Sequence, residues 1–284
     1  MVGLETTART RWPIMVMLVF AGPFLAQCEE QDTVPATPEE APAVAPAPVV
    51  VPAAAPLGRS DLLRAFDEAA SSFASGEAET RADPLVGRSF VIRLPFGCGG
   101  VQTRAEGAQP DPDGVGTVTW GSDGRSLILS LTPADWSDAS LLSGGGDRPQ
   151  WEAAEGFWIT QPWLRSEACP RVRTDPLQTG AATRSAQTTG LAAVFESDGS
   201  RIGRRDGRAY RHVVRGDDVA PPVASLAGYR ARLSGRVVGF PNRRAVRCTA
   251  SGGDQRPVCV AAIQLDEVAF ETAEGTVLSR WSSG

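Results

Sequence analysis

Two glutamates and three tryptophans in one short segment are the residues whose types and spacing best suit chemistry. Glu152 and Glu155 lie among Trp151, Trp158 and Trp163. Paired carboxylates can act as acid and base in glycoside hydrolysis, and exposed aromatic rings offer flat apolar platforms for sugars. Four of the seven tryptophans fall between positions 136 and 163, which makes this segment the candidate glycan site. The other interpretation is that these rings belong to the core.

Other catalytic groups are scarce in this chain. His212 is the single histidine, and no Gly-x-Ser-x-Gly motif accompanies it, so we expect it to be structural. All 28 basic residues are arginine, which excludes a phosphate-loop lysine, a Schiff-base lysine and a Ser-x-x-Lys nucleophile. The run 111–114, Asp-Pro-Asp-Gly, lacks the remaining ligands of a calcium loop and indicates a turn. We therefore expect no metal site and no cofactor.

Four of the five cysteines are expected to form two disulfides. Three pairings are possible, and we favour Cys248–Cys259, because a Gly-rich turn between them would let them face each other across a hairpin. The second pair, Cys98–Cys169, closes a long loop around the aromatic segment. The chain-entropy model gives these bridges roughly 3 and 4 kcal/mol, respectively. A zinc site is disfavoured, because it would need closer cysteine spacing or histidine ligands.

Residues 1–28 have the layout of a signal peptide. Arg9 and Arg11 precede an apolar run that is shorter than the roughly 20 residues of a membrane span. The run ends in residues 25–28, Leu-Ala-Gln-Cys, which resemble a bacterial lipobox and imply lipidation of Cys28. Gln27 stands where that pattern has Gly, Ala or Ser. The alternatives are a signal peptide cleaved near Ala26 or an uncleaved anchor.

Residues 29–57 form a Pro/Ala-rich linker, with seven prolines between Pro35 and Pro56. This composition is typical of a disordered, extended polyproline II segment. Because Glu29 follows the cysteine in place of the Asp that retains many lipoproteins in the inner membrane, the expected location is the outer membrane, facing the periplasm. Without lipid on Cys28, the protein would be soluble in the periplasm. In either case the linker leads into a domain spanning residues 58–284.

A single amphipathic helix, predicted over residues 60–75, leads this domain. Its apolar residues recur at helical spacing from Leu62 to Phe73, Ser60 and Asp61 can cap its start, and Gly76 can end it. We expect its apolar stripe to pack on the domain behind it.

Alternating apolar residues predict strands through the rest of the domain. Strands are expected at 90–96, 191–196, 257–271 and 276–281, and a hairpin joins 118–120 to 127–131. Two further hairpins are predicted: 201–205 with 208–214, around Asp206-Gly207, and 229–240 with 244–249. The predicted fold is mainly β: an antiparallel β-sandwich or a partly open barrel with one N-terminal helix.

The chain is mildly acidic, with a formal net charge of −5, and it lacks the basic footprint of a nucleic-acid-binding protein. We expect no nucleic-acid partner. The expected partners are an envelope protein or cell-wall glycan, and the membrane would be contacted through the N-terminal lipid or a signal anchor.

Three stretches carry a loose resemblance to a family: 88–98, 156–164 and 203–210. With them, residues 85–271 resemble exported proteins and lipoproteins of high-GC Gram-negative bacteria, a resemblance that implies export but no activity. The leading hypothesis is a tethered, non-enzymatic binding or structural protein of the cell envelope. The alternative is a hydrolase of envelope glycan that uses Glu152 or Glu155 as acid or base.

Overall fold

A computed structural model describes residues 54–77, 83–101, 113–143, 151–170, 186–216 and 220–282. The predicted signal peptide with Cys28, and all but the last four residues of the predicted linker, lie outside the described residues. Within the described ranges, no helix is long and apolar enough to cross a membrane.

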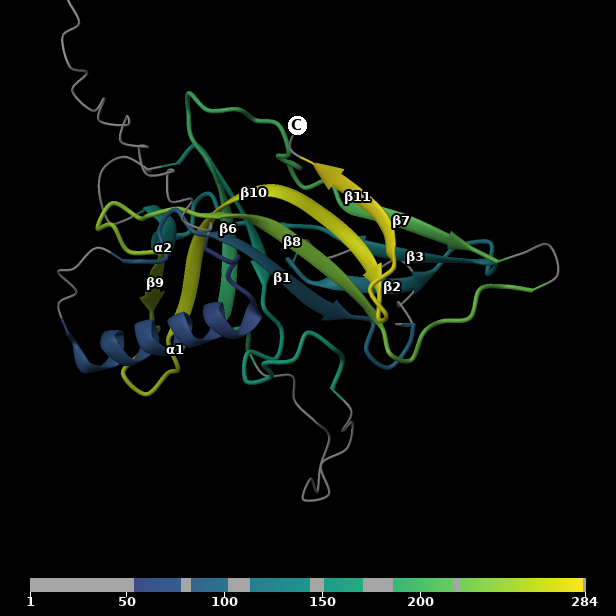
Figure 1. Cartoon of the computed structure of the whole chain (residues 1–284), viewed down its shortest axis with the longest axis horizontal. Helices are drawn as coiled ribbons and strands as arrows, with labels where there is room; N and C mark the ends of the chain where they lie inside the picture. The colour runs from purple at the N-terminus through teal and green to yellow at the C-terminus, as the bar shows by residue number, and fades with distance from the viewer. Residues whose placement is uncertain are drawn as a thin grey trace, which may run out of the picture. The chain divides into compact units, whose positions relative to one another are not determined.

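Two open sheets make up the domain (Figure 1). The larger sheet follows the order β1 (Ser89–Phe96), β8 (Tyr229–Val237), β10 (Val258–Thr272), β6 (Thr189–Phe195), β5 (Ala153–Trp158) and β4 (Ala134–Asp135). Two further strands, β9 (Val246–Thr249) and β11 (Val277–Ser282), also pair with β10. The smaller, antiparallel sheet contains β2 (Gly116–Trp120), β3 (Ser126–Leu131) and β7 (Tyr210–Arg215). The mainly β prediction is confirmed. The larger sheet is mixed, because β6 and β10 run parallel.

The long strand β10 connects the parts of the larger sheet because its partners change along its length. The Ala262 amide donates to the Ala245 carbonyl at 3.2 Å, while its carbonyl accepts from the Val238 amide at 3.0 Å. Past this point β10 pairs with β8 and then β11. Its register against β8 shifts between Leu265 and Glu267, which is a β-bulge. Bulges bend strands and redirect side chains, and this one borders the candidate site described below.

Apolar side chains on both faces of the larger sheet form two core clusters. The main cluster includes fully buried Phe157 and Phe270 and the β3 residue Leu129. The second cluster packs Trp151 and Phe240 on the other face, beside the short helix α2 (Ser140–Ser143). Strands β5 and β6 are buried almost continuously, as expected for strands covered on both faces.

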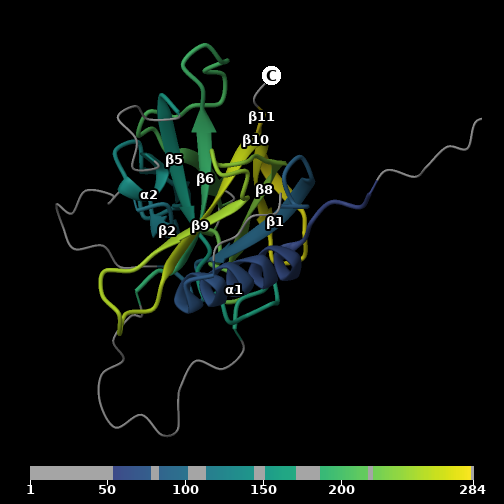
Figure 2. The same ribbon diagram turned by 90° about the vertical axis from the view of Figure 1, so that its left-hand side faces the viewer.

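Helix α1 (Arg59–Ser75) lies across one end of the larger sheet, beside β1 and β9 (Figure 2). The predicted helix is confirmed, but it starts one residue earlier, with Gly58 at the N-cap. The Asp61 carboxylate accepts from the Gly58 amide at 3.0 Å. Gly76 adopts φ 69° and ends the helix as predicted. At that end Phe73 is 45% exposed, so the apolar stripe is not buried over its full length.

Arg59 attaches the start of α1 to a distant segment. Although only 2% exposed, this arginine has no carboxylate in hydrogen-bonding distance within the described chain. Its guanidinium donates instead to the carbonyls of Leu164, Thr160 and Gln161, at 2.8, 2.9 and 3.3 Å. These bonds join the start of α1 to the segment 160–164, which contains Trp163.

The structure contains the two disulfides that the sequence analysis favours. Cys98 is bonded to Cys169 over a separation of 71 residues, and Cys248 to Cys259 over 11. The second pair faces directly across β9 and β10, where the two cysteines are register partners.

The strand pairing predicted for the hairpins 201–205 with 208–214 and 229–240 with 244–249 is wrong. Residues 201–205 form no strand, and β7 pairs with β3 instead. In the other predicted hairpin a tight turn forms, with the Phe240 amide donating to the Arg244 carbonyl at 2.8 Å. Its two flanking strands, β8 and β9, both pair with β10 and not with each other. Local turn signals identified both turns, but the flanking strands have other partners: β7 pairs with β3, and β8 and β9 pair with β10.

One face of the larger sheet carries a row of arginines. Arg93, Arg232 and Arg280 are in register across β1, β8 and β11, with Ala269 of β10 between the last two. Two carboxylates of β10, two residues to either side of Ala269, lie between these arginines.

Positively and negatively charged side chains alternate along this row. Glu271 contacts Arg93 at 2.7 Å and Arg232 at 3.2 Å. Glu267 contacts Arg232, and it contacts Arg280 at 3.1 Å. Glu167 adds a further pair with Arg93 at 3.3 Å. We call these six residues the ion ladder.

Candidate functional site

The two predicted acidic residues converge on one loop. Glu155 lies in β5 and is 7% exposed. Its Oε1 accepts hydrogen bonds from the backbone amides of Arg205 and Asp206, at 2.6 and 2.8 Å. The Arg205 amide would have paired with Arg208 in the predicted hairpin, and its bond to Glu155 removes that ladder bond. Residues 200–209 are called the arginine loop from here on.

Burial gives Glu155 an unusual electrostatic environment. Desolvation raises the pKa of its carboxyl group, and the hydrogen bonds from Asp206 and Arg205 oppose that rise. Its second oxygen, Oε2, is buried and has no hydrogen-bond partner among the described residues. A carboxylate in this position holds a loop in place.

Glu152 holds the same loop from its solvent side. Its Oε1 contacts Arg201 at 2.7 Å and Arg204 at 3.2 Å. Arg204 also contacts the Asp206 carboxylate at 2.5 Å. Both carboxylates predicted as acid or base therefore contribute to positioning the arginine loop.

The remaining two arginines of the loop are held by backbone carbonyls. Arg205 donates to the carbonyls of Arg208 and Ala209 at 3.2 and 2.9 Å. Arg208 donates to those of Arg205 and Arg204 at 2.9 and 3.3 Å. The turn between them has φ 50° at Asp206 and 75° at Gly207, a left-handed backbone that suits the Asp-Gly pair. In the described part of the chain, neither guanidinium forms an ion pair, and each keeps donors to spare.

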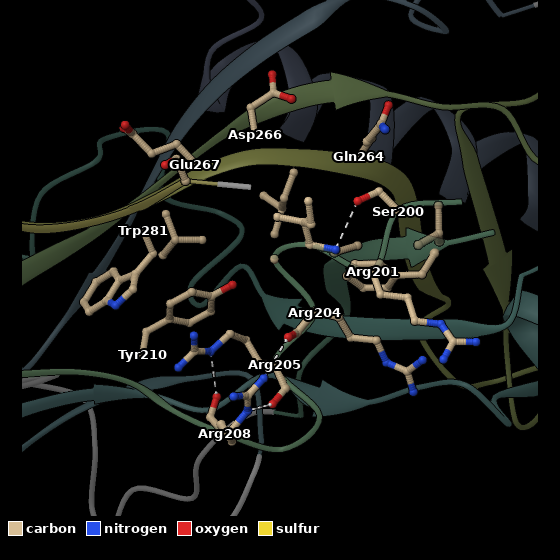
Figure 3. A pocket seen from close by; sticks show the side chains of 18 residues that line it. Ser200, Arg201, Arg204, Arg205, Arg208, Tyr210, Gln264, Asp266, Glu267 and Trp281 are labelled. Atoms are coloured by element: carbon tan, nitrogen blue, oxygen red, sulfur yellow. Dashed lines mark hydrogen bonds between the residues drawn. The ribbon is translucent and has the colours of Figure 1, made fainter. Parts of the chain in front are cut away.

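A hollow of about 470 Å³ lies between the arginine loop and the bulge of β10 (Figure 3). Its rim carries all four arginines of the loop. Its other walls come from β6, from the start of β7 and from β11, and its lining includes Phe195, Tyr210, Leu265, Val268 and Trp281. Residues from four separate stretches of sequence thus meet around one space.

Tyr210 is the aromatic centre of this hollow. The Arg205 guanidinium lies over its ring, 4.7 Å from the centroid, and Trp281 meets it edge to face at 5.3 Å. In Figure 3 its hydroxyl points toward the middle of the lining side chains. Desolvation raises the pKa of this hydroxyl, and nearby Glu155 raises it further. The hydroxyl is therefore neutral at physiological pH and can donate a hydrogen bond.

The three predicted glycan-stacking tryptophans are not on one surface. Trp151 is 6% exposed and packs against Phe240, with ring centroids 5.3 Å apart. Trp158 is half-buried and meets Trp136 edge to face at 4.7 Å. Trp163 is 68% exposed. The structure packs Trp151 and Trp158 against other aromatic rings, so Trp163 alone of the three is available at the surface.

Other predicted groups stand apart from the hollow. His212 lies in β7 and is half-buried, and desolvation lowers its pKa. It does not line the hollow. Among the described residues, no cluster of three or more acidic, histidine or cysteine side chains is arranged to hold a metal ion.

The main lining of the site was not predicted from the sequence. Four arginines within eight residues, at positions 201, 204, 205 and 208, were an available signal. Tyr210 and Trp281 gave no comparable signal, because they lie in strands of different sheets, β7 and β11, and meet only where the two sheets pack together. Comparison with protein-family models, with curated proteins and with solved structures finds no match for the chain.

Proposed function

We propose that the chain is a tethered, non-enzymatic binding protein of the cell envelope, and that its arginine-lined hollow receives a component of that envelope. The observation that carries this proposal is the bracing of the arginine loop by Glu155 and Glu152. A loop held from both sides presents its side chains with little ordering cost on binding. That is the property that a binding site needs.

The same bracing argues against the alternative, a hydrolase of envelope glycan. An acid or base must reach the reacting atoms, and Glu155 does not line the hollow and has one oxygen occupied by two backbone amides. Glu152 is paired with two guanidinium groups. We therefore assign both residues to positioning the loop.

Tethering is proposed through lipid on Cys28 and the Pro-rich linker, with the domain facing the periplasm. The two disulfides support this placement to the extent that they are compatible with an oxidising compartment. Intact mass measured on protein from its own envelope fraction tests the tether. A lipid-sized increment on a chain starting at Cys28 is expected. An unmodified chain starting near Gln27 would refute the tether and leave a soluble binding protein.

The binding role is tested on purified cell-wall glycan and on envelope fractions. The proposal expects binding without release of products. Release of glycan fragments that is lost in a folded Glu155→Gln variant would instead establish the hydrolase. If neither binding nor turnover is seen with either material, the proposed function is wrong.

A further inference from the structure

We infer that the hollow binds a small organic anion, with one carboxylate or phosphate head on an apolar body. This inference rests on the proposed function and specifies the ligand class of the same site. It comes from three features of the hollow: unused arginine donors, an aromatic floor and a free hydroxyl.

The arginine donors specify the charge of the ligand. Arg205 and Arg208 line the hollow, and within the described chain no carboxylate is paired with either. Their bonds to carbonyls fix the orientation of the guanidinium groups but leave their charge uncompensated. In a chain with a net charge of −5, such a pair forms a local positive site. Guanidinium groups bind carboxylate and phosphate by charge-assisted hydrogen bonds.

The floor specifies the body of the ligand. The rings of Tyr210 and Trp281 and the side chains of Leu265, Val268 and Phe195 line the space behind the rim. Such a surface favours an aromatic or aliphatic group. The volume of about 470 Å³ lies within the range of small-molecule pockets. An inorganic ion would leave this floor unfilled.

The Tyr210 hydroxyl supplies a neutral hydrogen-bond donor between the arginines of the rim and the apolar floor. The residue is 3% exposed, and its hydroxyl makes no hydrogen bond within the described chain. The ring is held by Arg205 on its face and Trp281 at its edge, so the hydroxyl is fixed in place. A carboxylate or phosphate oxygen at the rim can accept this bond.

The opposite wall limits the ligand to one anionic head. Glu267 and Asp266 of the β10 bulge line that side of the hollow. Glu267 is already paired with Arg232 and Arg280. A second anionic group placed beside these carboxylates would be repelled.

Isothermal titration of the mature full chain with four probes tests the inference. Benzoate and phenyl phosphate carry both features, inorganic phosphate lacks the apolar body, and benzyl alcohol lacks the charge. We expect benzoate or phenyl phosphate to bind with a dissociation constant of about 1 mM or below. Inorganic phosphate and benzyl alcohol should bind at least about tenfold more weakly. Comparing benzoate with phenyl phosphate separates the carboxylate and phosphate forms of the head.

Matched variants locate the binding. Arg208→Gln should weaken binding of the better probe about tenfold, the effect of one charge-assisted hydrogen bond. Arg256→Gln removes the same charge from an exposed residue between β9 and β10, outside the hollow, and should leave binding unchanged. Tyr210→Phe removes only the hydroxyl and should weaken binding about threefold. Urea unfolding of each variant confirms that it is folded.

Equal binding of benzyl alcohol and benzoate, equal binding of inorganic and phenyl phosphate, or unchanged binding in Arg208→Gln would overturn the inference. Absence of binding by all probes would do the same. If the wild type then still binds envelope material without turnover, only the ligand class is wrong. If it binds neither probes nor envelope material, the proposed function fails as well.

Discussion

Two arginine-rich regions of this domain use their charge in different ways. In the ion ladder, carboxylates and guanidinium groups alternate across four strands, and Glu271, at 1% exposure, bridges Arg93 and Arg232. In the arginine loop, Arg201 and Arg204 share Glu152, while among the described residues the hydrogen-bond acceptors of Arg205 and Arg208 are backbone carbonyls alone. The two regions approach each other at Glu267, which belongs to the ladder and also lines the hollow.

The difference separates arginines that stabilise from arginines available to a ligand. Removing the charge of Glu271 would leave Arg93 and Arg232 with one carboxylate partner each, Glu167 and Glu267, in place of two. In the arginine loop the buried carboxylate, Glu155, accepts hydrogen bonds from backbone amides, so it does not neutralise the guanidinium groups of Arg205 and Arg208. An abundance of arginine therefore says little about function until the partner of each guanidinium is known.

The largest effect is expected in the ladder. Glu271→Gln should lower the free energy of unfolding by about 3 kcal/mol, because it removes the buried charge that pairs two arginines. Benzoate or phenyl phosphate binding should stay within about twofold of wild type, since Glu271 does not line the hollow. Urea denaturation and the titration described above measure both quantities. Glu68→Gln, at an exposed position of α1, is the matched control and should be near neutral.

The next effect concerns the dependence of stability on pH at Glu155. Burial raises the pKa of this carboxyl group in the folded state. The folded protein therefore binds more protons than the unfolded chain between the ordinary pKa and the raised one. Stability that is present below the ordinary value is lost as the pH rises through the raised value.

Glu155→Gln removes this titration and keeps an oxygen that can accept from the Arg205 and Asp206 amides. Measured by urea unfolding between about pH 4 and pH 8, the variant should gain stability relative to wild type as the pH rises. A difference that is constant with pH, or that changes in the other direction, would contradict the assignment of Glu155 as a desolvated anchor.

The smallest effect is expected at the solvent side of the loop. Glu152→Gln should cost less than about 1 kcal/mol of stability, because its ion pairs are partly exposed. Removing this carboxylate also removes one of the two braces of the arginine loop, although Arg204 keeps its contact with Asp206, so probe anions should bind about twofold to threefold more weakly. Tighter binding in a folded Glu152→Gln variant would mean that the freed charge of Arg201 matters more than the bracing of the loop.

Much of the local structure was predictable from periodicity. The helix α1, the β2–β3 hairpin and strands β1, β10 and β11 follow apolar spacing within short windows. The disulfide Cys248–Cys259 was predictable because a turn brings its cysteines together locally. The parallel pairing of β6 with β10 was not, because no local signal specifies which distant strand a buried strand will join.

The candidate site shows the same limit. The Asp206-Gly207 turn was recognised, but its role was not, because the carboxylate that accepts from the Arg205 and Asp206 amides, Glu155, lies about fifty residues earlier in the chain. Glu152 and Glu155, predicted as acid or base, contact the arginine loop and do not line the hollow. Strand β5 itself was missed because its residues are buried on both faces and do not alternate.

The most direct test of a binding role for the hollow is site-specific photocrosslinking in intact envelopes. A photoreactive phenylalanine analogue replaces Ile202, which lines the hollow and is 61% exposed, or Arg256 as a control. We expect a discrete crosslinked envelope component from position 202, absent from position 256 and reduced by Arg208→Gln. No adduct at position 202, or the same adducts from both positions, would contradict the central claim that this hollow is the binding site.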